Sequence, residues 1–161
     1  MTATYEKIAT TTVSGSSTST ITLNSISGAY TDLVVIINGS YTGAFDAIEV
    51  QANGDTGSNY SRTILFGNGS SAGSSRASNG TNMGLGLLGT ENSTNVFHIN
   101  NYSNPNVNKT FLARANSASN QTRAVVGLWR SNSAITSLTF NTSSSTYTSG
   151  TTFTLYGIKA A

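Results

Sequence analysis

The stretch TDLVVIING, Thr31–Gly39, is a continuous run of apolar side chains between an aspartate and an Asn-Gly pair. Its valines and isoleucines are β-branched, and such residues favour strands. A strand with one face in water would alternate apolar and polar residues, and this run does not alternate. We therefore predict a strand in the middle of a sheet, with both of its faces covered.

Further runs of the same kind lie on both sides of this stretch. They are short, rich in Val, Ile, Leu, Phe and Thr, and bounded by Gly, Asn or Ser, which is typical of strands. With TDLVVIING they make about ten strands at a spacing of about 8 to 12 residues, as in an all-β sandwich or barrel. The runs are Tyr5–Val13, Ser19–Ile26, Asp46–Ala52, Tyr60–Gly67, Met83–Leu88, Asn95–Tyr102, Lys109–Ala115, Arg123–Arg130, Ala134–Asn141 and Thr152–Lys159.

Three segments do not have the pattern of strands. Ser14–Thr20 is rich in Ser and Thr and indicates a turn or a flexible joint. Gly67–Asn82 is too polar and too small-sided to pack, and loops of that length are usually mobile or engaged with a partner. Thr142–Gly150 indicates the long end of a hairpin. A chain of 161 residues is suited to a single domain, in which residues 1–15 form either an extended N-terminal arm or the first strand.

Charged side chains are few: they make up only 9% of the residues, against about a quarter in ordinary soluble domains. The net charge is +2, and the eight cations are scattered along the sequence without the clustering that a nucleic-acid surface requires. We therefore expect no nucleic-acid partner. The cations are Lys7, Arg62, Arg76, Lys109, Arg114, Arg123, Arg130 and Lys159.

The sequence has no cysteine, so neither disulfides nor thiolate metal sites are available. The N-terminal residues MTATYEKIATTT lack a basic region followed by an apolar run, so we expect no signal peptide. No apolar stretch reaches the length of a membrane span. These features predict a soluble protein that is made in the cytoplasm and does not associate with membranes.

The residues that could carry catalysis are few. The single histidine, His98, lies in a predicted strand, and without a nucleophile motif it is better explained as a strand histidine than as a general base. A glycosidase needs two carboxylates about 5 to 10 Å apart, and the only cluster that could supply them is Asp46, Glu49 and Asp55. Glu49 alternates with Ile48 and Val50, so we expect it to face water. We expect no enzymatic activity.

The segment VQANGDTGSNYSRTI, Val50–Ile64, has the appearance of a cation-binding loop. Asn53, Asp55, Gly57 and Asn59 alternate in it, but calcium loops use several carboxylates and a bidentate glutamate. Asn-Gly and Asp-Thr-Gly also form turns, because Gly accepts positive φ and Asx side chains cap their own backbone. We interpret the segment as a turn, expect no metal or cofactor, and leave an ion in this loop as the alternative.

A sugar site would need exposed aromatic rings with polar neighbours. Tyr and Trp on strands more often lie at the edge of the core than on the surface, and the sequence does not show which face these residues take. The candidates are Tyr30, Tyr41, Tyr60, Tyr102, Trp129 and Tyr147.

From Tyr30 to Ala161 the chain resembles a family of small β-rich structural proteins and domains of tailed bacteriophages. The motifs that carry the resemblance are NGDTGSNYS, Asn53–Ser61, and LYGIK, Leu155–Lys159. Members of this family occur as separate virion proteins and as modules of tail or fibre proteins. The resemblance implies no catalytic residues, and it supports the interpretation of Asn53–Ser61 as a structural turn.

The fold that we predict is a single-domain, jelly-roll-like antiparallel β-sandwich. The function that we predict is that of a capsid decoration, or cement, protein in the virion, bound as a homotrimer to the major capsid protein or another virion protein. A tail or fibre module that recognises host glycans through aromatic residues and the segments 67–82 and 142–150 is the alternative. A glycoside hydrolase using Asp46, Glu49 or Asp55 is the weakest hypothesis.

Overall fold

The computed structural model describes residues 4–15, 18–43, 45–118 and 121–159. These residues form twelve strands and no helix. The strands are β1 (Tyr5–Thr12), β2 (Thr20–Leu23), β3 (Asp32–Gly39), β4 (Asp46–Ala52), β5 (Tyr60–Gly67), β6 (Ala72–Gly80), β7 (Met83–Leu88), β8 (Ser93–Asn100), β9 (Lys109–Ser117), β10 (Gln121–Trp129), β11 (Leu138–Thr142) and β12 (Thr152–Ile158).

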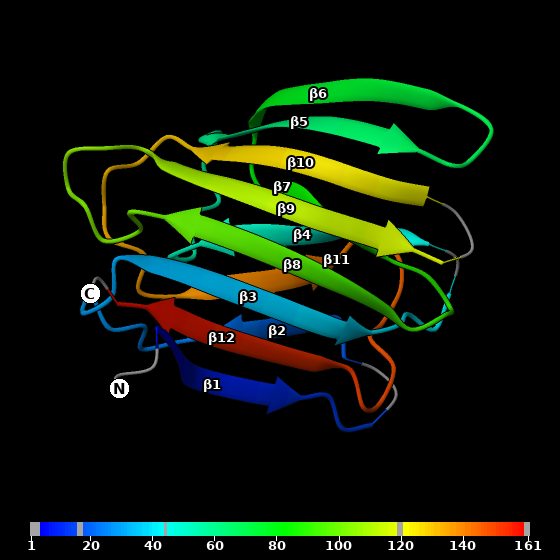
Figure 1. Ribbon diagram of the computed structural model, residues 1–161, viewed down its shortest axis with the longest axis horizontal. Coiled ribbons are helices and arrows are strands. Elements are labelled where there is room, and N and C mark those ends of the chain that lie inside the picture. Colours follow the sequence, from blue (N-terminus) through cyan, green and yellow to red (C-terminus); the bar gives the residue numbers. More distant parts are fainter. Residues whose placement is uncertain (1–3, 16–17, 44, 119–120, 160–161) are drawn as a thin grey trace.

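The strands form two antiparallel sheets that face each other, as Figure 1 shows. The large sheet has eight strands in the order β1-β12-β3-β8-β9-β10-β5-β6, and the small sheet has four in the order β2-β11-β4-β7. The small sheet lies behind only part of the large one (Figure 1). The large sheet therefore has an inner face toward the small sheet and an outer face with no layer of strands over it.

Eight of the strands form a jelly roll, in which β1-β12-β3-β8 in one sheet face β2-β11-β4-β7 in the other. The remaining four strands enter as two pairs, with β5 and β6 between β4 and β7 and with β9 and β10 between β8 and β11. Both pairs add to the large sheet beyond β8. This four-stranded addition, β9-β10-β5-β6, is called the extension below. The expectation of a jelly-roll-like antiparallel sandwich is confirmed.

Alternating side chains build the core between the sheets. In β9 the residues from Lys109 to Ser117 alternate between buried and more exposed positions, and β12 does the same. Aromatic rings join the two sheets: the Phe140 ring of β11 lies 6.2 Å from that of Phe97 in β8 and 5.4 Å from that of Phe153 in β12, between centroids. Each such buried ring contributes about 1.5–3 kcal/mol by leaving water.

The asparagine amide of β8 joins the two sheets by hydrogen bonds. Asn95 has no exposed surface, and its amide accepts from the Leu87 N–H at 2.8 Å and donates to the Leu87 C=O at 2.9 Å. Leu87 lies on β7, which is the edge strand of the small sheet. At Leu87, one side chain therefore binds the two backbone groups that a further strand would otherwise have bound.

The opening run Thr31–Gly39 forms β3, which lies inside the large sheet between β12 and β8. Leu33, Val35 and Ile37 point toward the small sheet and are fully buried. On the outer face Val34 is buried and Asn38 is exposed, although no second sheet lies there. The interior position is confirmed, and the expected cover on both faces is wrong because the second sheet covers only one.

Each run predicted to be a strand overlaps one, and three strands, β4, β5 and β7, have the predicted bounds. The prediction for Gly67–Asn82 is wrong, because Ala72–Gly80 of that segment forms the edge strand β6. Backbone pairing with β5, rather than burial of side chains, holds this strand. The eleven predicted runs correspond to eleven strands, and β6 is the twelfth.

The structure also differs from the predictions for two other segments. Thr142–Gly150 is not the end of a hairpin, since β11 and β12 lie in different sheets. In Ser14–Thr20, residues 16–17 lie outside the described residues, while Thr18 bridges to Tyr147 and Thr20 begins β2. Of the N-terminal segment, Tyr5–Thr12 is a first strand paired with β12, and residues 1–3 lie outside the described part.

Candidate functional site: the outer face of the large sheet

The Asn-Gly segment after β4 is a tight turn that holds a distant loop. Asn53 and Gly54 have φ of +53° and +66°, and the Asp55 N–H donates to the Ala52 C=O at 3.0 Å. The Asn53 side chain accepts from the N–H groups of Thr136 and Ser137 and donates to the Ala134 C=O. The amide therefore fixes the loop before β11 against the turn.

The carboxylate of Asp55 is used within this turn. Its Oδ1 accepts from the Gly57 N–H at 2.8 Å, and its Oδ2 accepts from Trp129 Nε1 at 2.7 Å and from Asn59 Nδ2 at 2.9 Å. The indole hydrogen bond, followed by that of Asn59, lowers the pKa of the Asp55 carboxyl. Both carboxylate oxygens bind protein donors, which supports the structural interpretation of the segment.

The other two acidic candidates lie in different surroundings. The Asp46 carboxylate accepts from the N–H and hydroxyl groups of Ser143 and Ser144. Burial acts to raise the pKa of Asp46, but these hydrogen bonds outweigh it and the pKa is lowered. Glu49 lies between two fully buried residues of β4 and is itself half-buried, so the prediction that it faces water is only partly right. It accepts from Asn82 Nδ2 at 3.1 Å, and burial and Asp46 raise its pKa. Through their hydrogen bonds, Asp46 and Asp55 thus each fix the position of a neighbouring loop.

His98 lies on the outer face of the large sheet, half-buried in β8. Its strand neighbours on that face are Val34 and Leu112. Within the described ranges, no three or more His, Asp or Glu side chains come together in a group that could hold a metal ion.

Five of the six aromatic candidates for sugar stacking lie in the core. Tyr41, Tyr60, Tyr102, Trp129 and Tyr147 are each at most 3% exposed. Tyr30 is half-buried and lies beneath Lys159, whose Nζ is 5.6 Å from the ring centroid. Most of the aromatic rings that were candidates for a glycan-binding site are therefore buried inside the protein.

A buried cation that the sequence analysis did not single out fixes loops at the same end of the molecule as the Asn53 turn, because Lys109 pairs with Trp129, whose indole binds Asp55. Lys109 has no exposed surface, and its ammonium donates to the C=O groups of Asn104, Val107 and Asn132 at 2.7, 2.7 and 3.1 Å. Burial lowers its pKa. The sequence does contain a signal for this position, because Lys109 and Phe111 are two residues apart in β9 and so lie on the same, inner face.

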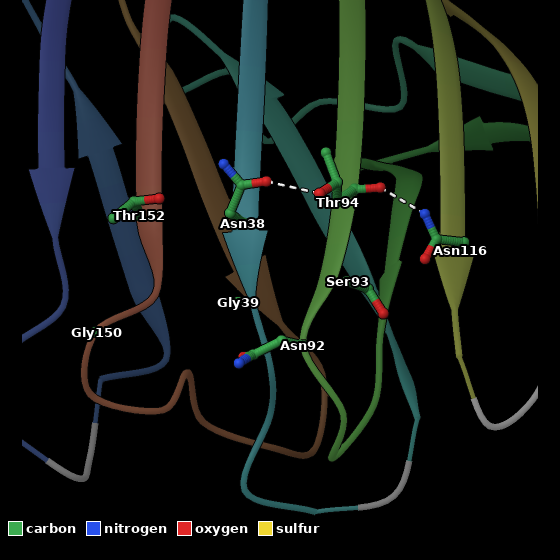
Figure 2. Close-up of a pocket in the computed structure, with 8 residues that line it drawn as sticks. All are labelled: Asn38, Gly39, Asn92, Ser93, Thr94, Asn116, Gly150 and Thr152. Atoms are coloured by element: carbon green, nitrogen blue, oxygen red, sulfur yellow. Dashed lines mark hydrogen bonds between the residues drawn. The ribbon is translucent and has the colours of Figure 1, made fainter.

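A shallow polar pocket of about 450 Å³ lies on the outer face at one end of the sheet, and Figure 2 shows its lining. Thr152, Asn38, Thr94 and Asn116 form a row across β12, β3, β8 and β9. Thr94 Oγ1 donates to Asn38 Oδ1 at 2.7 Å, and Asn116 Nδ2 donates to the Thr94 C=O at 2.6 Å. The lining has amides and hydroxyls but no charged side chain.

Further along the outer face, the extension carries large apolar side chains in water. Leu65, Leu112 and Val126 are 60%, 52% and 53% exposed. Val126 of β10 is directly opposite Leu112 of β9, and Ala124, two residues before Val126, is opposite Leu65 of β5. Because these four residues share one face and adjoin each other, we call them the apolar patch.

Folding also gathers charge that is dispersed in the sequence. The four strands of the extension contain Arg62, Arg76, Lys109, Arg114 and Arg123 and no aspartate or glutamate. Arg76 and Arg114 are exposed, and their register with Thr63 and Val96 places them on the outer face. The extension is therefore basic, and its outer face combines two arginines with the apolar patch.

Comparison with known proteins gave no match: none was found among family models, curated proteins or solved structures. Among the described residues, no helix is long and apolar enough to cross a membrane.

Proposed function

We propose that the protein is a non-enzymatic structural protein of a tailed-bacteriophage particle, and that it acts as a capsid decoration protein on the head. The observation that carries this proposal is the exposed apolar patch on an open sheet face. Contiguous apolar surface of this kind marks interaction sites. The resemblance of NGDTGSNYS and LYGIK to phage structural proteins supplies the biological setting, and jelly rolls are frequent in viral capsid proteins. Fold alone does not define function.

The surroundings of the acidic residues favour a structural protein over a hydrolase. Asp46 and Asp55 accept hydrogen bonds from neighbouring loops, and their pKa values are lowered. A general acid requires a carboxyl that stays protonated near neutral pH, which means a raised pKa. Glu49 has a raised pKa, so the variant Glu49→Gln tests the hydrolase hypothesis. A hydrolase that used Glu49 would lose its glycan-cleaving activity in this variant, and we expect no such loss.

Electron cryo-microscopy of the intact particle tests the assignment to the head. We expect density for this jelly roll in many copies over the capsid lattice, in contact with the shell protein. Density at the tail tip alone would contradict the proposal. The same maps test the expected homotrimer, because three copies must then surround a threefold or quasi-threefold position.

The polar pocket of Figure 2 favours a second candidate function, recognition of a host glycan by a tail or fibre module. Amides and hydroxyls are groups that bind sugar hydroxyls, and the lining contains Asn38, Thr94 and Asn116. The burial of most aromatic candidates weakens this alternative, since no ring faces the pocket. A glycan array separates the functions: reproducible binding that Thr94→Val abolishes would favour recognition, and an array without hits would count against it.

A further inference from the structure

The apolar patch lies between two hollows on the outer face of the extension. On the β6 side, a hollow of about 240 Å³ is lined by Arg76, Val126 and Leu128, among others. On the β8 side, a hollow of about 340 Å³ is lined by Arg114, Val96 and others. The strand order β8-β9-β10-β5-β6 in Figure 1 places the hollows on opposite sides of the patch. The surface therefore has an apolar centre with a cation-lined hollow at each side.

The two outer arginines are available for a partner. In the described part of the chain the one salt bridge joins Lys159 and Glu6, at the β1-β12 edge of the same sheet. Neither Arg76 nor Arg114 is within salt-bridge distance of a carboxylate there, and the extension contains no acidic residue. Any carboxylate that pairs with these two arginines would therefore come from another molecule.

Two possible occupants fit this surface poorly. A second copy bound face to face would bring arginines toward arginines, and like charges placed together across an interface are costly. Nucleic acid needs a track of several cations or aromatic rings on which bases stack. Here Arg62 borders the hollow on the β6 side, but its guanidinium lies on the inner face near Gly84 of β7, and Lys109 is fully buried. The centre of the surface is aliphatic.

We infer that the apolar patch and its two arginine-lined hollows dock onto an acidic protein surface with an apolar centre. This inference rests on the proposed function, under which the acidic surface belongs to the shell of the head. Aliphatic contacts at the centre supply affinity, while the arginines at the rim orient the protein and make the association rate depend on salt.

The test uses the full-length protein and heads of the same phage from which it has been removed. Binding is measured by co-sedimentation over a range of salt concentrations. The variants are Leu112→Ser with Val126→Ser for the centre, and Arg114→Glu for the rim. The matched control is Lys7→Glu, an exposed cation on the outer face of the same sheet at its opposite edge. We expect each patch variant to bind at least about tenfold more weakly, the control to bind normally, and salt to weaken wild type more than Arg114→Glu.

The other outcomes separate the two proposals. If wild type binds heads and the patch variants bind equally well, the docking inference is overturned and the decoration function stands. If wild type binds purified tails instead of heads, and the patch variants lose that binding, the docking surface stands and the decoration function fails. Binding to a 30-base-pair DNA duplex that Arg114→Glu abolishes would overturn the protein partner. A change in the sedimentation mass of the free protein caused by Leu112→Ser would identify a second copy as the occupant and overturn the inference.

Discussion

Replacing Asn95 tests whether one buried amide joins the two sheets. The variant Asn95→Leu is close in size but leaves both the N–H and the C=O of Leu87 without their partner. An unsatisfied buried group costs about 1–3 kcal/mol, so two groups predict a loss of about 2–6 kcal/mol in the free energy of unfolding. For a protein of ordinary marginal stability this is a large fraction of the total. Urea denaturation followed by circular dichroism measures it.

The variant Asn95→Asp provides a second test, in which the free energy of unfolding should depend on pH. Its carboxyl accepts from the Leu87 N–H when ionised, and donates to the Leu87 C=O only when protonated. Burial raises the folded-state pKa of this new carboxyl above its unfolded value of about 3.9. The protonated form is then favoured in the folded state, so stability relative to wild type is highest below pH 4 and falls as the pH rises through the folded pKa.

The control is Asn100→Leu, at an exposed position of the same strand, where we expect a change within about 0.5 kcal/mol. An Asn95→Leu variant that stays within about 1 kcal/mol of wild type, with an unchanged denaturant slope, would refute the role given to this amide. An Asn95→Asp variant without the pH dependence would refute the donor half of the bridge.

Three further predictions concern other buried or fixed groups. Lys109→Met removes the donor shared by three loop carbonyls and should lower the free energy of unfolding in urea by about 1.5–3 kcal/mol; a stabilised variant would contradict this. Because hydrogen bonds lower the folded-state pKa of Asp55, it contributes stability above pH 4 that is lost as the pH falls through the folded value. Asp55→Asn should remove that part of the acid sensitivity, and the fluorescence of Trp129, the only tryptophan, should shift to the red; an unaltered acid transition would argue against the hydrogen bond. Gly157→Ala would place its Cβ on the ring of Tyr30 and should cost about 1–3 kcal/mol, seen as a lower melting temperature; the double variant with Tyr30→Ala should recover most of the loss.

The strands that could be predicted from the sequence are those held by burial. β4 alternates buried and half-buried residues, and its bounds follow from the alternation. β6 has no such pattern, because the backbone of β5 rather than the core holds it. Backbone hydrogen bonds to a neighbouring strand far from the core place few demands on the side chains. A strand held in this way can be rich in Ser and Asn, and its composition is then that of a loop.

The features of the candidate site depend on contacts between distant residues. The turn at Asn53 could be predicted from Asn-Gly chemistry, whereas its indole partner Trp129 is 74 residues from Asp55 and no local pattern connects them. The apolar patch was missed for another reason. Leu112 and Val126 alternate with buried residues, but alternation alone does not say which face of a strand lacks a covering sheet.

The edge strand β6 affects whether two copies of this protein join their sheets at high concentration. An open edge invites pairing with another chain, and Ala72–Gly80 exposes one. Arg76 stands at the midpoint of that strand, so antiparallel pairing of two copies in the symmetric register would place the two guanidinium groups opposite each other. A single charge at this position therefore disfavours edge-to-edge pairing of two copies through β6.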